Sequence, residues 1–429
     1  MPPTTTPPAA AAGPAASSHP PLRAVLPPLI LGTATFNTQY VSDPLSMPYH
    51  SIISRALALG VSAFDTSPYY GPSETLLGTA LHELMSPVPT ASNHTPVPVP
   101  RSSFAIITKA GRVAPEEFDY SPEWIRYSVL RSLQRLHTDY LDLVYTHDAE
   151  FVTPGEVLAA VRELRRLRDE EGLVRYVGIS GFPVDTLAEL AEMILAETGE
   201  PVDAVLSYGH FTVQNGRLAG GGETSSLARL KRAGVDVVLN ASILGMGLLT
   251  SRGIPADPEP SSKESENPLA KWHPSPAGLR VACKTLAGIA ERAGERLESV
   301  AIRWSLEEWA RVGAIAGVET PPGQRVGGTV CGVSSIAELE ETVKEWREVQ
   351  AGLENASKGG FEYGSPRQEK VLKLVREQMW PALGEWKDYV WESGGPGFVN
   401  KRREEDKGVA PDDGVVAAHE ARKSTQKAP

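Results

Sequence analysis

Four polar residues follow apolar segments in the first third of the chain. Asp65 lies at the end of VSAFDT (61–66), with Tyr70 just beyond it, while Lys109 ends FAIITK (104–109) and His147 ends YLDLVYTH (140–147). A lysine at the end of an apolar segment is costly to bury unless an anion pairs with it, and Asp65 is the candidate. Each residue alone fits a plain role, such as a helix cap for Asp65 or core packing for His147. Their coincidence on three successive segments predicts one site.

These residue types indicate proton exchange rather than nucleophilic attack. A phenol normally titrates near pH 10, and a nearby cation favours the phenolate, so we expect Lys109 to lower the pKa of Tyr70. Asp65 would keep the lysine charged, and His147 would donate a hydrogen bond to the reacting oxygen. No residue is placed as an activated acyl-transfer nucleophile, and no cluster has metal-ligand spacing. The set suits redox chemistry at a C–O centre, with the electrons carried by a cofactor.

The elements that would position these residues alternate regularly along the chain. Strands are predicted at 28–34, 61–66, 104–109, 140–147, 174–180, 202–207, 235–242 and 328–333, and helical periodicity fills 51–60, 74–85, 123–136, 157–170, 184–197, 227–234, 279–309 and 336–350. Nearly apolar strands are typical of parallel sheets buried on both faces. Eight such units predict an α/β fold, the closed (β/α)8 TIM barrel, in which adjacent strand ends meet at one mouth. An open doubly wound sheet is the alternative, but no Gly-x-Gly-x-x-Gly motif follows the first strand.

Composition divides the rest of the chain. We expect a disordered Pro/Ala-rich tail over 1–26, the barrel over 27–350, a C-terminal helical extension over 351–398 and a disordered charged tail over 399–429. An amphipathic helix over 367–391 should pack across the outside or the bottom of the barrel. Of three insertions, the one at 251–276 follows the seventh strand and should lie at the catalytic face. Those at 86–101 and 317–328 precede strands and should lie at the opposite face.

Charge and cysteine usage exclude several classes of protein. The formal net charge of -11 argues against a broad nucleic-acid surface, and the two cysteines suit buried thiols rather than disulfides or metal ligands. No apolar run approaches the ~20 residues that cross a bilayer, and the N-terminus lacks the features of a secretory signal. We therefore expect a cytoplasmic protein with no metal, no nucleic-acid partner and no membrane partner.

Several motifs resemble those of the aldo-keto reductases. LGTATF (31–36), FDTSPYYGPSETLLG (64–78), ITKAG (107–111), YSVLRSLQRLHTDYLDLVYTHD (127–148), VRYVGISG (174–181) and LGMGLLT (244–250) follow the family's order and spacing, over about Pro28 to Val349. The resemblance implies that Asp65, Tyr70, Lys109 and His147 form the family's catalytic tetrad, with Tyr70 as proton donor or acceptor. LSYGHF (206–211), NASILGMGLLT (240–250) and KWHPSP (271–276) resemble the L-galactose dehydrogenases and the fungal D-arabinose 1-dehydrogenases within that family.

The resemblance also implies a nicotinamide cofactor. Its contacts would come from Gly32, Thr33, Asp65, Ser180, Ser207, Ser242, Leu244, Gly245, Ser334, Ser335, Glu338 and Glu341. Two positions depart from the family's pattern: Gly181 stands where relatives usually carry Asn, and Ala241 where many stack an aromatic ring on the nicotinamide.

The segment after the eighth strand bears on the choice between NAD and NADP. NADP-using relatives place Lys or Arg here, whereas this chain has Ser334, Ser335 and Glu338, with no basic residue before Lys344. A carboxylate repels a 2′-phosphate but accepts a hydrogen bond from a ribose hydroxyl. We therefore predict NAD, with NADP less favoured; Glu341 would meet the adenine amino group. The alternative for Glu338 is a side chain pointing to solvent.

An NAD enzyme would ordinarily oxidise its substrate. We expect oxidation of the anomeric carbon of a D-arabinose, L-galactose or L-fucose type of aldose to the aldonolactone, with Tyr70 as proton acceptor. Candidate contacts to the small-molecule sugar substrate are Tyr40, Tyr69, His147, His210, Trp272 and His273. The alternatives are an NADPH-dependent aldehyde or ketone reductase of the same fold and a non-catalytic, cofactor-binding regulatory subunit.

Overall fold

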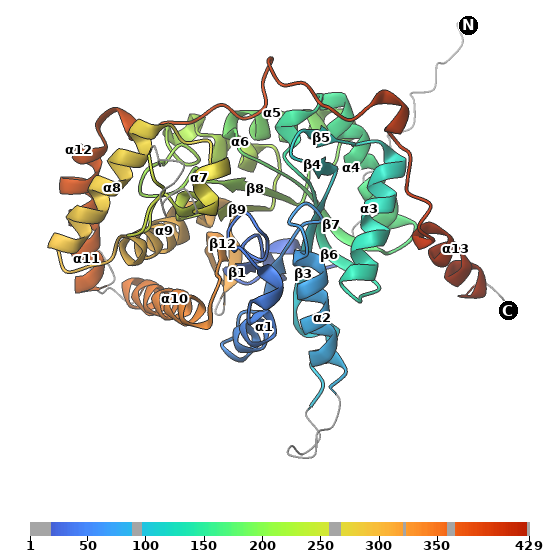
Figure 1. Cartoon of the computed structure of the whole chain (residues 1–429), viewed down its shortest axis with the longest axis horizontal. Helices are drawn as coiled ribbons and strands as arrows, with labels where there is room; N and C mark the ends of the chain where they lie inside the picture. The colour runs from blue at the N-terminus through green and yellow to red at the C-terminus, as the bar shows by residue number, and fades with distance from the viewer. Residues whose placement is uncertain (1–18, 88–96, 257–266, 321–322, 358–364, 427–429) are drawn as a thin grey trace, which may run out of the picture.

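Eight parallel strands form a closed barrel at the centre of the molecule (Figure 1). The computed structural model describes residues 19–87, 97–256, 267–320, 323–357 and 365–426. The strands, in chain order, are β1 (Leu29–Gly32), β2 (Ala63–Asp65), β3 (Ala105–Ala110), β6 (Leu141–Thr146), β7 (Val174–Gly181), β8 (Ala204–Tyr208), β9 (Val237–Ala241) and β12 (Gly328–Gly332). This result confirms the predicted TIM barrel and all eight of its predicted strands.

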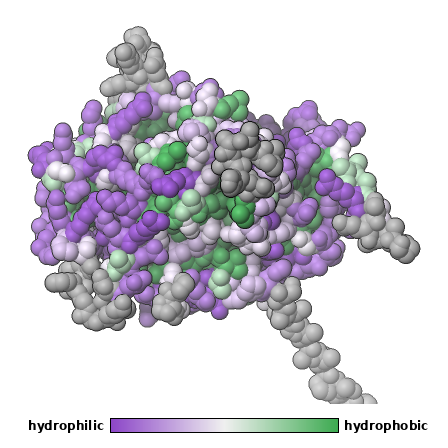
Figure 2. All heavy atoms as spheres, turned by 90° about the horizontal axis from the view of Figure 1, so that it is seen from below, coloured by the Kyte–Doolittle hydropathy of each residue, from purple (hydrophilic) through white to green (hydrophobic). Residues whose placement is uncertain are grey.

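Helices surround the barrel and cover the outward-facing sides of its strands, except the five-residue α7, which lies in the loop after β9. They are α1 (Tyr49–Ala58), α2 (Ser73–Met85), α3 (Pro122–Arg135), α4 (Pro154–Asp169), α5 (Val184–Thr198), α6 (Ser226–Arg232), α7 (Pro268–Trp272), α8 (Ala277–Arg292), α9 (Leu297–Val312) and α10 (Ile336–Ser357). The helical stretch expected over 279–309 is two helices, because Gly294 adopts a left-handed φ of 74° between α8 and α9. On the face drawn in Figure 2, hydrophilic residues cover most of the exterior and hydrophobic residues show in smaller patches between them.

Strand register brings the predicted catalytic residues to one end of the barrel. Asp65 pairs with Ile107 across β2 and β3, and Lys109 pairs with Tyr145 across β3 and β6. His147 directly follows β6 and donates its backbone N–H to Ala110. All three side chains therefore lie at the carboxyl ends of adjacent strands, where barrel enzymes build their sites.

Two short antiparallel hairpins were not predicted. β4 (Arg112–Ala114) and β5 (Glu117–Phe118) follow β3 at the carboxyl mouth. β10 (Val318–Thr320) and β11 (Gln324–Val326) precede β12 at the opposite end, where the 317–328 insertion was expected.

The chain closes the amino-terminal end of the barrel with residues that were expected to be disordered. Residues 1–18 lie outside the described part, but Leu22–Ala24 form a 3-10 helix, and Leu22 and Leu26 are buried. Arg23 forms ion pairs of 2.8 Å with Asp236 and Glu319. Here the structure departs from the predicted 1–26 tail, because two leucines and an arginine give the end of that tail enough contacts to order it.

The C-terminal extension packs outside the barrel on α8 and α9. It consists of α11 (Pro366–Lys373), a π-helical turn (Leu374–Met379), α12 (Trp380–Leu383) and a 3-10 turn (Gly384–Trp386). The helix expected to reach residue 391 ends earlier, because Gly384 turns the chain with a φ of 53°. Its outside packing is as predicted.

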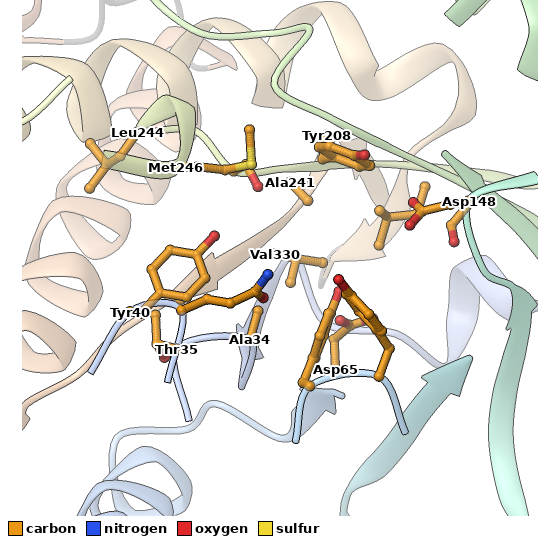
Figure 3. Close-up of a pocket in the computed structure, with 18 of the residues that line it drawn as sticks. Ala34, Thr35, Tyr40, Asp65, Asp148, Tyr208, Ala241, Leu244, Met246 and Val330 are labelled. Carbon is orange, nitrogen blue, oxygen red and sulfur yellow. The ribbon is translucent and has the colours of Figure 1, made fainter. Parts of the chain in front are cut away.

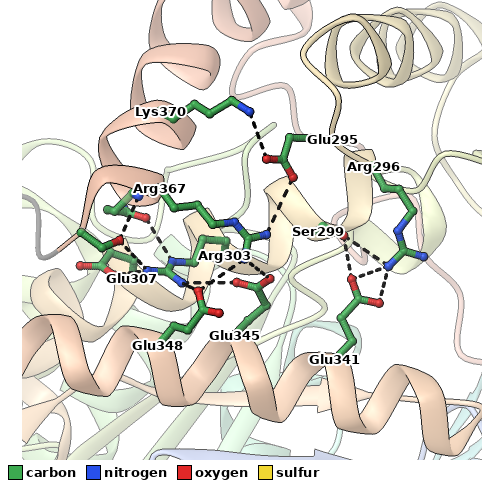
Figure 4. A network of polar contacts seen from close by, with 12 residues as sticks. Glu295, Arg296, Ser299, Arg303, Glu307, Glu341, Glu345, Glu348, Arg367 and Lys370 are labelled. Atoms are coloured by element: carbon green, nitrogen blue, oxygen red, sulfur yellow. Dashed lines mark hydrogen bonds and ion pairs between the residues drawn. The ribbon is translucent and has the colours of Figure 1, made fainter.

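A buried ion network attaches this extension to the barrel (Figure 4). Arg303 of α9, fully buried, donates hydrogen bonds to Glu345 and Glu348 of α10 at 3.4 and 2.7 Å. Arg367 of α11 pairs with the same Glu345 at 2.8 Å. The network therefore joins three helices through shared carboxylates.

The last part of the chain returns along the carboxyl face of the barrel (Figure 1). Asn400 exchanges hydrogen bonds with the backbone of Phe118, and Gly408 N–H donates to Asp119. The helix α13 (Val415–Gln426) packs on α3 and buries Val415. The structure thus departs from the predicted disordered tail over 399–429, because paired charges and one apolar residue attach this segment to the barrel. Residues 427–429 lie outside the described part.

Within the described part, none of the helices is long and apolar enough to span a membrane.

Candidate active site

The four predicted catalytic residues meet at the barrel mouth. Lys109 Nζ donates hydrogen bonds to Asp65 Oδ1 at 2.6 Å and to the carbonyl of Thr66 at 3.0 Å, and it lies 5.0 Å from the centroid of the Tyr70 ring. The rings of Tyr70 and His147 meet edge to face with centroids 5.6 Å apart. Asp65, Lys109 and His147 are each no more than 4% exposed. The structure therefore brings together all four side chains.

The electrostatic setting of Tyr70 differs from our expectation. We expected Lys109 to lower the pKa of the phenol. Burial, followed by the charges of Asp65 and Asp148, raises the pKa of Tyr70 well above its usual value instead, and Arg112 opposes that shift. Asp65 neutralises the lysine at 2.6 Å, so the ion pair as a whole does not act on the ring as a free cation. In the site without cofactor or substrate, Tyr70 is a protonated phenol.

His147 is a neutral hydrogen-bonding group. Burial lowers its pKa to about 3, against the raising effect of Asp148. Its Nδ1 lies 2.9 Å from the hydroxyl of Ser67, which in turn accepts the backbone N–H of Tyr69 at 3.1 Å. If the serine hydroxyl donates to Nδ1, the proton of the neutral ring is on Nε2. That tautomer makes His147 a donor toward an oxygen in the mouth.

A cavity of about 520 Å³ extends from this group across the mouth of the barrel (Figure 3). Twelve of the residues predicted from the sequence line it: Gly32, Tyr40, Asp65, Tyr69, Tyr70, Lys109, His147, Ser180, Ser242, Leu244, Trp272 and Glu338. The cavity also reaches Thr342 on α10, so one continuous space joins the tetrad to the start of that helix. Among the described residues, no group of three or more His, Cys, Asp or Glu side chains is arranged to hold a metal ion.

Other predicted cofactor residues lie beside the cavity without lining it. Thr33 is buried and donates its hydroxyl to the carbonyl of Asp65 at 3.0 Å. Ser207 lies between Leu206 and Tyr208, which do line the cavity, so the alternation of side chains along β8 directs Ser207 away from it. Gly245 has a φ of 55° in a turn whose neighbours Leu244 and Met246 line the wall. The structure thus does not bring these side chains into the cavity.

The two departures from the family's pattern have structural counterparts. The Ser180 hydroxyl donates to the carbonyl of Thr146 at 3.0 Å. At Gly181, a Cβ would collide with the carboxyl of Glu150, which fills the space that a side chain there would need. Ala241 lines the cavity with Tyr208 of the neighbouring strand, so an aromatic ring is present on β8 rather than β9 (Figure 3).

At the far end of the cavity, Glu338 belongs to the start of α10. Its carboxylate accepts hydrogen bonds from the backbone N–H and the hydroxyl of Ser334 at 2.7 and 2.9 Å, and its own N–H donates to Ser335 at 3.2 Å. Both serines therefore cap the helix rather than line the cavity, whereas Glu338 does both.

Arg296 lies near this end of the cavity, although the segment from Ser334 to Glu341 contains no basic residue. Glu341, expected at the adenine, instead accepts hydrogen bonds from Arg296 and from the hydroxyl of Ser299 (Figure 4). The charges of Glu341, Glu298 and Glu338 raise the pKa of Arg296. The carboxylates around this guanidinium outnumber it, so the surroundings remain acidic.

The predicted sugar contacts divide into two groups. Tyr40 and Trp272 line the cavity and meet with centroids 5.5 Å apart, and the indole N–H of Trp272 donates to the carbonyl of Gln39 at 2.8 Å. His210 is buried against Phe182 and is bonded to the carbonyl of Tyr208, while His273 is buried and bonded to the carbonyl of Gly245. These two histidines are packing residues in this structure, because neither lines the cavity and each bonds to the backbone through at least one ring nitrogen.

Several lining residues were not identified from the sequence. Arg112 and Asp148 line the cavity next to Tyr69 and His147, and the segment 387–398, here called the mouth segment, contributes Trp391, Glu392, Ser393 and Gly394. Asp148 could have been found from its place after His147. The mouth segment carries no comparable signal, because its position depends on the extension that precedes it.

Comparisons with known proteins agree with this geometry. The model of the Aldo/keto reductase family matches residues 28–351. D-arabinose 1-dehydrogenase of Saccharomyces cerevisiae is 37% identical over 340 residues, covering 79% of this chain and 88% of the yeast protein. L-galactose dehydrogenase of Arabidopsis thaliana is 31% identical over 334 residues, covering 77% and 86%. Glycerol dehydrogenase from Gluconobacter oxydans superposes with a TM-score of 0.52 at 21% identity, covering 87% of this chain and 95% of that one, which shows a common fold. The chain therefore belongs to the aldo/keto reductase family.

Proposed function

We propose that this protein is an NAD-dependent aldose 1-dehydrogenase, which oxidises the anomeric carbon of a sugar of the D-arabinose, L-galactose or L-fucose type to the aldonolactone. The observation that carries the proposal is the polar mouth of the cavity, where Arg112 and Asp148 lie beside Tyr70 and His147. These two residues pair with each other, and a hydrophobic aldehyde would leave their remaining hydrogen-bonding capacity unused, whereas a sugar hydroxyl can bond to both. The printed names of the two sugar dehydrogenases add support.

The residues of the mouth divide the reaction between them. A bound oxidised nicotinamide would supply the acceptor for the hydride that leaves the anomeric carbon. Tyr70, once it has lost its own proton, accepts as phenolate the proton of the anomeric hydroxyl, while His147, through Nε2, donates a hydrogen bond to that oxygen. Lys109 and Asp65 hold each other at 2.6 Å beneath the ring and fix the position of the phenol.

The shape and the donor groups of the cavity fit a dinucleotide. The space joins the tetrad to Glu338 and Thr342, so its two ends can take the two halves of one elongated molecule. Ser180 would hold the carboxamide, and the loop from Ser242 to Gly247 would hold the pyrophosphate. Ser242 and Met246 adopt left-handed φ values of 56° and 53° in that loop, a backbone form that turns N–H groups toward an anion.

The acidic far end supports NAD over NADP. Glu338 lines the cavity there, and the guanidinium of Arg296 is engaged by Glu341. A 2′-phosphate would have to displace that carboxylate to reach the arginine. A ribose hydroxyl is uncharged and can bind without displacing Glu341 from Arg296.

A single assay tests the proposal. The purified protein is incubated with D-arabinose, L-galactose or L-fucose and with NAD or NADP, and reduced cofactor is followed by absorbance. We expect oxidation with NAD, and a loss of at least roughly 10³-fold in kcat for Tyr70→Phe. Tyr176→Phe is the control, because its hydroxyl bonds to Pro20 at the opposite end of the barrel. Strong preference for NADP, no oxidation of any of the three sugars, or full activity of Tyr70→Phe would contradict the proposal.

One observation favours a second function, reduction of an aldehyde or ketone with NADPH. The raised pKa of Tyr70 keeps the phenol protonated, and a protonated phenol is ready to act as a proton donor. The same assay run in reverse, with NADPH and an aldehyde, separates the two functions by the ratio of their kcat/KM values.

A further inference from the structure

We propose that the ion pair of Arg112 and Asp148 recognises the sugar hydroxyl next to the reacting carbon, and so makes the enzyme selective for 2-hydroxy aldoses over 2-deoxy aldoses. This inference rests on the proposed aldose dehydrogenase function and deepens it. It assigns a specificity role to two residues outside the tetrad.

Asp148 presents a buried carboxylate to the cavity beside His147. It directly follows His147 with a φ of 56° and a ψ of 63°, a left-handed conformation that Asp adopts more readily than most non-glycine residues. Asp148 is 2% exposed, and it lines the cavity (Figure 3). Its Oδ2 lies 3.7 Å from His147 Nε2. The left-handed turn therefore places a buried carboxylate directly beside the nitrogen that faces the reacting oxygen.

Arg112 supplies the matching donor from the neighbouring strand. It follows β3 in the β4–β5 hairpin, pairs with Asp148 through Nη1, and stacks with its guanidinium carbon 3.9 Å from the centroid of the Tyr69 ring. Within the described residues, its Nε is buried and makes no hydrogen bond. A buried donor without a partner is costly, so packing alone does not satisfy the hydrogen-bonding capacity of this guanidinium.

A purely structural role explains only part of this arrangement. Arg112 also donates to the carbonyl of Pro115 at 3.2 Å, which would help to hold the hairpin. That contact leaves Nε unpaired and does not explain why both members of the pair line the cavity. Buried ion pairs contribute little net stability compared with apolar residues of similar size, so stability alone is a weak reason for this pair.

The chemistry of the pair matches a hydroxyl group. A hydroxyl donates one hydrogen bond and accepts others, so it can donate to Asp148 and accept from Arg112. Because His147 contacts the anomeric oxygen, a carboxylate 3.7 Å from its ring lies within reach of the oxygen on the adjacent carbon. A site built to bond a hydroxyl rejects an analogue that lacks it strongly, since buried polar groups then remain unpaired.

The test compares D-arabinose with 2-deoxy-D-ribose, which lacks only the C2 hydroxyl of D-arabinose. The wild-type protein should show a kcat/KM ratio on the order of 10³ in favour of the 2-hydroxy sugar, and Asp148→Asn should reduce that ratio to about tenfold, mainly by slowing the 2-hydroxy sugar. If L-galactose or L-fucose is the better substrate, the corresponding 2-deoxy sugar replaces 2-deoxy-D-ribose.

Asp142, near the start of β6, is a matched control for Asp148, which follows the end of that strand. Asp142 is also 2% exposed and pairs with Arg101 at 2.7 Å. Asp142→Asn should leave the sugar ratio unchanged. Arg112→Lys, which keeps the charge but removes Nε, should lower the ratio and serves as the second variant if Asp148→Asn does not fold.

The outcomes separate this inference from the proposed function. If the wild-type protein oxidises no aldose, the proposed function fails. If it oxidises aldoses but treats the 2-hydroxy and 2-deoxy sugars alike, or if a folded Asp148→Asn slows both by the same factor, the recognition role is overturned and the function stands.

Discussion

The hydroxyl of Ser393 donates a 2.9 Å hydrogen bond to the carboxyl of Glu150, although 243 positions separate the two residues. The same carboxyl oxygen accepts the backbone N–H of Phe182 at 3.1 Å. Gly181 and Gly394 enclose this glutamate, since a Cβ at either position would collide with it. Glu150 therefore attaches the mouth segment to the end of β7.

The contribution of Glu150 to the stability of the fold should fall as pH rises, because burial disfavours its ionised form. Burial, followed by the charge of Asp148, raises the pKa of Glu150 to about 8, whereas an unfolded chain loses that proton near pH 4.3. The folded state binds more protons between these values, so the contribution to stability is fully present below about pH 4 and is lost as pH rises through about 8. Glu150→Gln, which cannot ionise, should remove this part of the pH dependence in urea unfolding.

The control for that experiment is Glu404→Gln, whose side chain is 84% exposed. It should leave the pH dependence of unfolding as it is in the wild type. The free energies of unfolding of Glu150→Gln and the wild type should diverge between about pH 5 and about pH 9, where this carboxyl titrates. Curves that stay parallel over this range would show that the carboxyl does not titrate as described.

The pH dependence of the rate should follow Tyr70 and not His147. Because burial and the carboxylates Asp65 and Asp148 raise the pKa of Tyr70, the phenolate fraction grows with pH and kcat/KM for oxidation should rise without a plateau to about pH 9. His147, with its pKa lowered to about 3, stays neutral over that range. An inflection near pH 6.5, the ordinary value of a histidine, would contradict this assignment.

Lys109 and Asp65 should depend on each other for stability. Lys109→Met leaves a buried carboxylate without its cation, so we expect a loss of about 3–5 kcal/mol in the free energy of unfolding. The double variant Asp65→Asn with Lys109→Met removes both charges and should recover most of that loss while remaining inactive. Losses that simply add in the double variant would mean that the two side chains do not interact.

The network behind α9 gives a stability prediction far from the chemistry. Arg303→Met leaves the buried Glu307 and Glu345 carboxylates without a shared cation and should cost about 3–5 kcal/mol. Arg376→Met is the matched control, because its pair with Glu308 is half exposed and should contribute less than about 1 kcal/mol. Limited proteolysis should cleave the C-terminal extension from the Arg303 variant before it does so in the Arg376 variant. Equal losses of unfolding free energy in the two variants would show that the buried network contributes no more than the surface pair.

The barrel and its tetrad could be predicted because local pattern determines them. Each strand reads as an apolar run, and Asp65, Lys109 and His147 stand where such runs end. The pKa of Tyr70 was predicted in the wrong direction, because the balance of burial against charge depends on residues such as Asp148, whose position only the fold reveals.

Contacts between segments far apart in the chain were the hardest features to predict from the sequence. Arg296 reaches Glu341 from another helix, and this pairing moves Glu341 away from its expected partner. His210 and His273 were predicted to contact a sugar, but each is buried outside the cavity and bonds to a backbone carbonyl through one ring nitrogen. The region after Asn400 was judged too polar to fold, but hydrogen bonds from Asn400 and Gly408 and the burial of Val415 attach it to the barrel.

The mouth segment follows the barrel in the sequence and is therefore synthesised after it. The last strand of the barrel ends at Gly332, whereas the residues that complete the cavity begin at Trp391. A chain emerging from the ribosome could therefore close its barrel and assemble the tetrad before the wall formed by Trp391 to Gly394 exists. The wall of the cavity formed by the mouth segment would then be the last part of the site to be assembled.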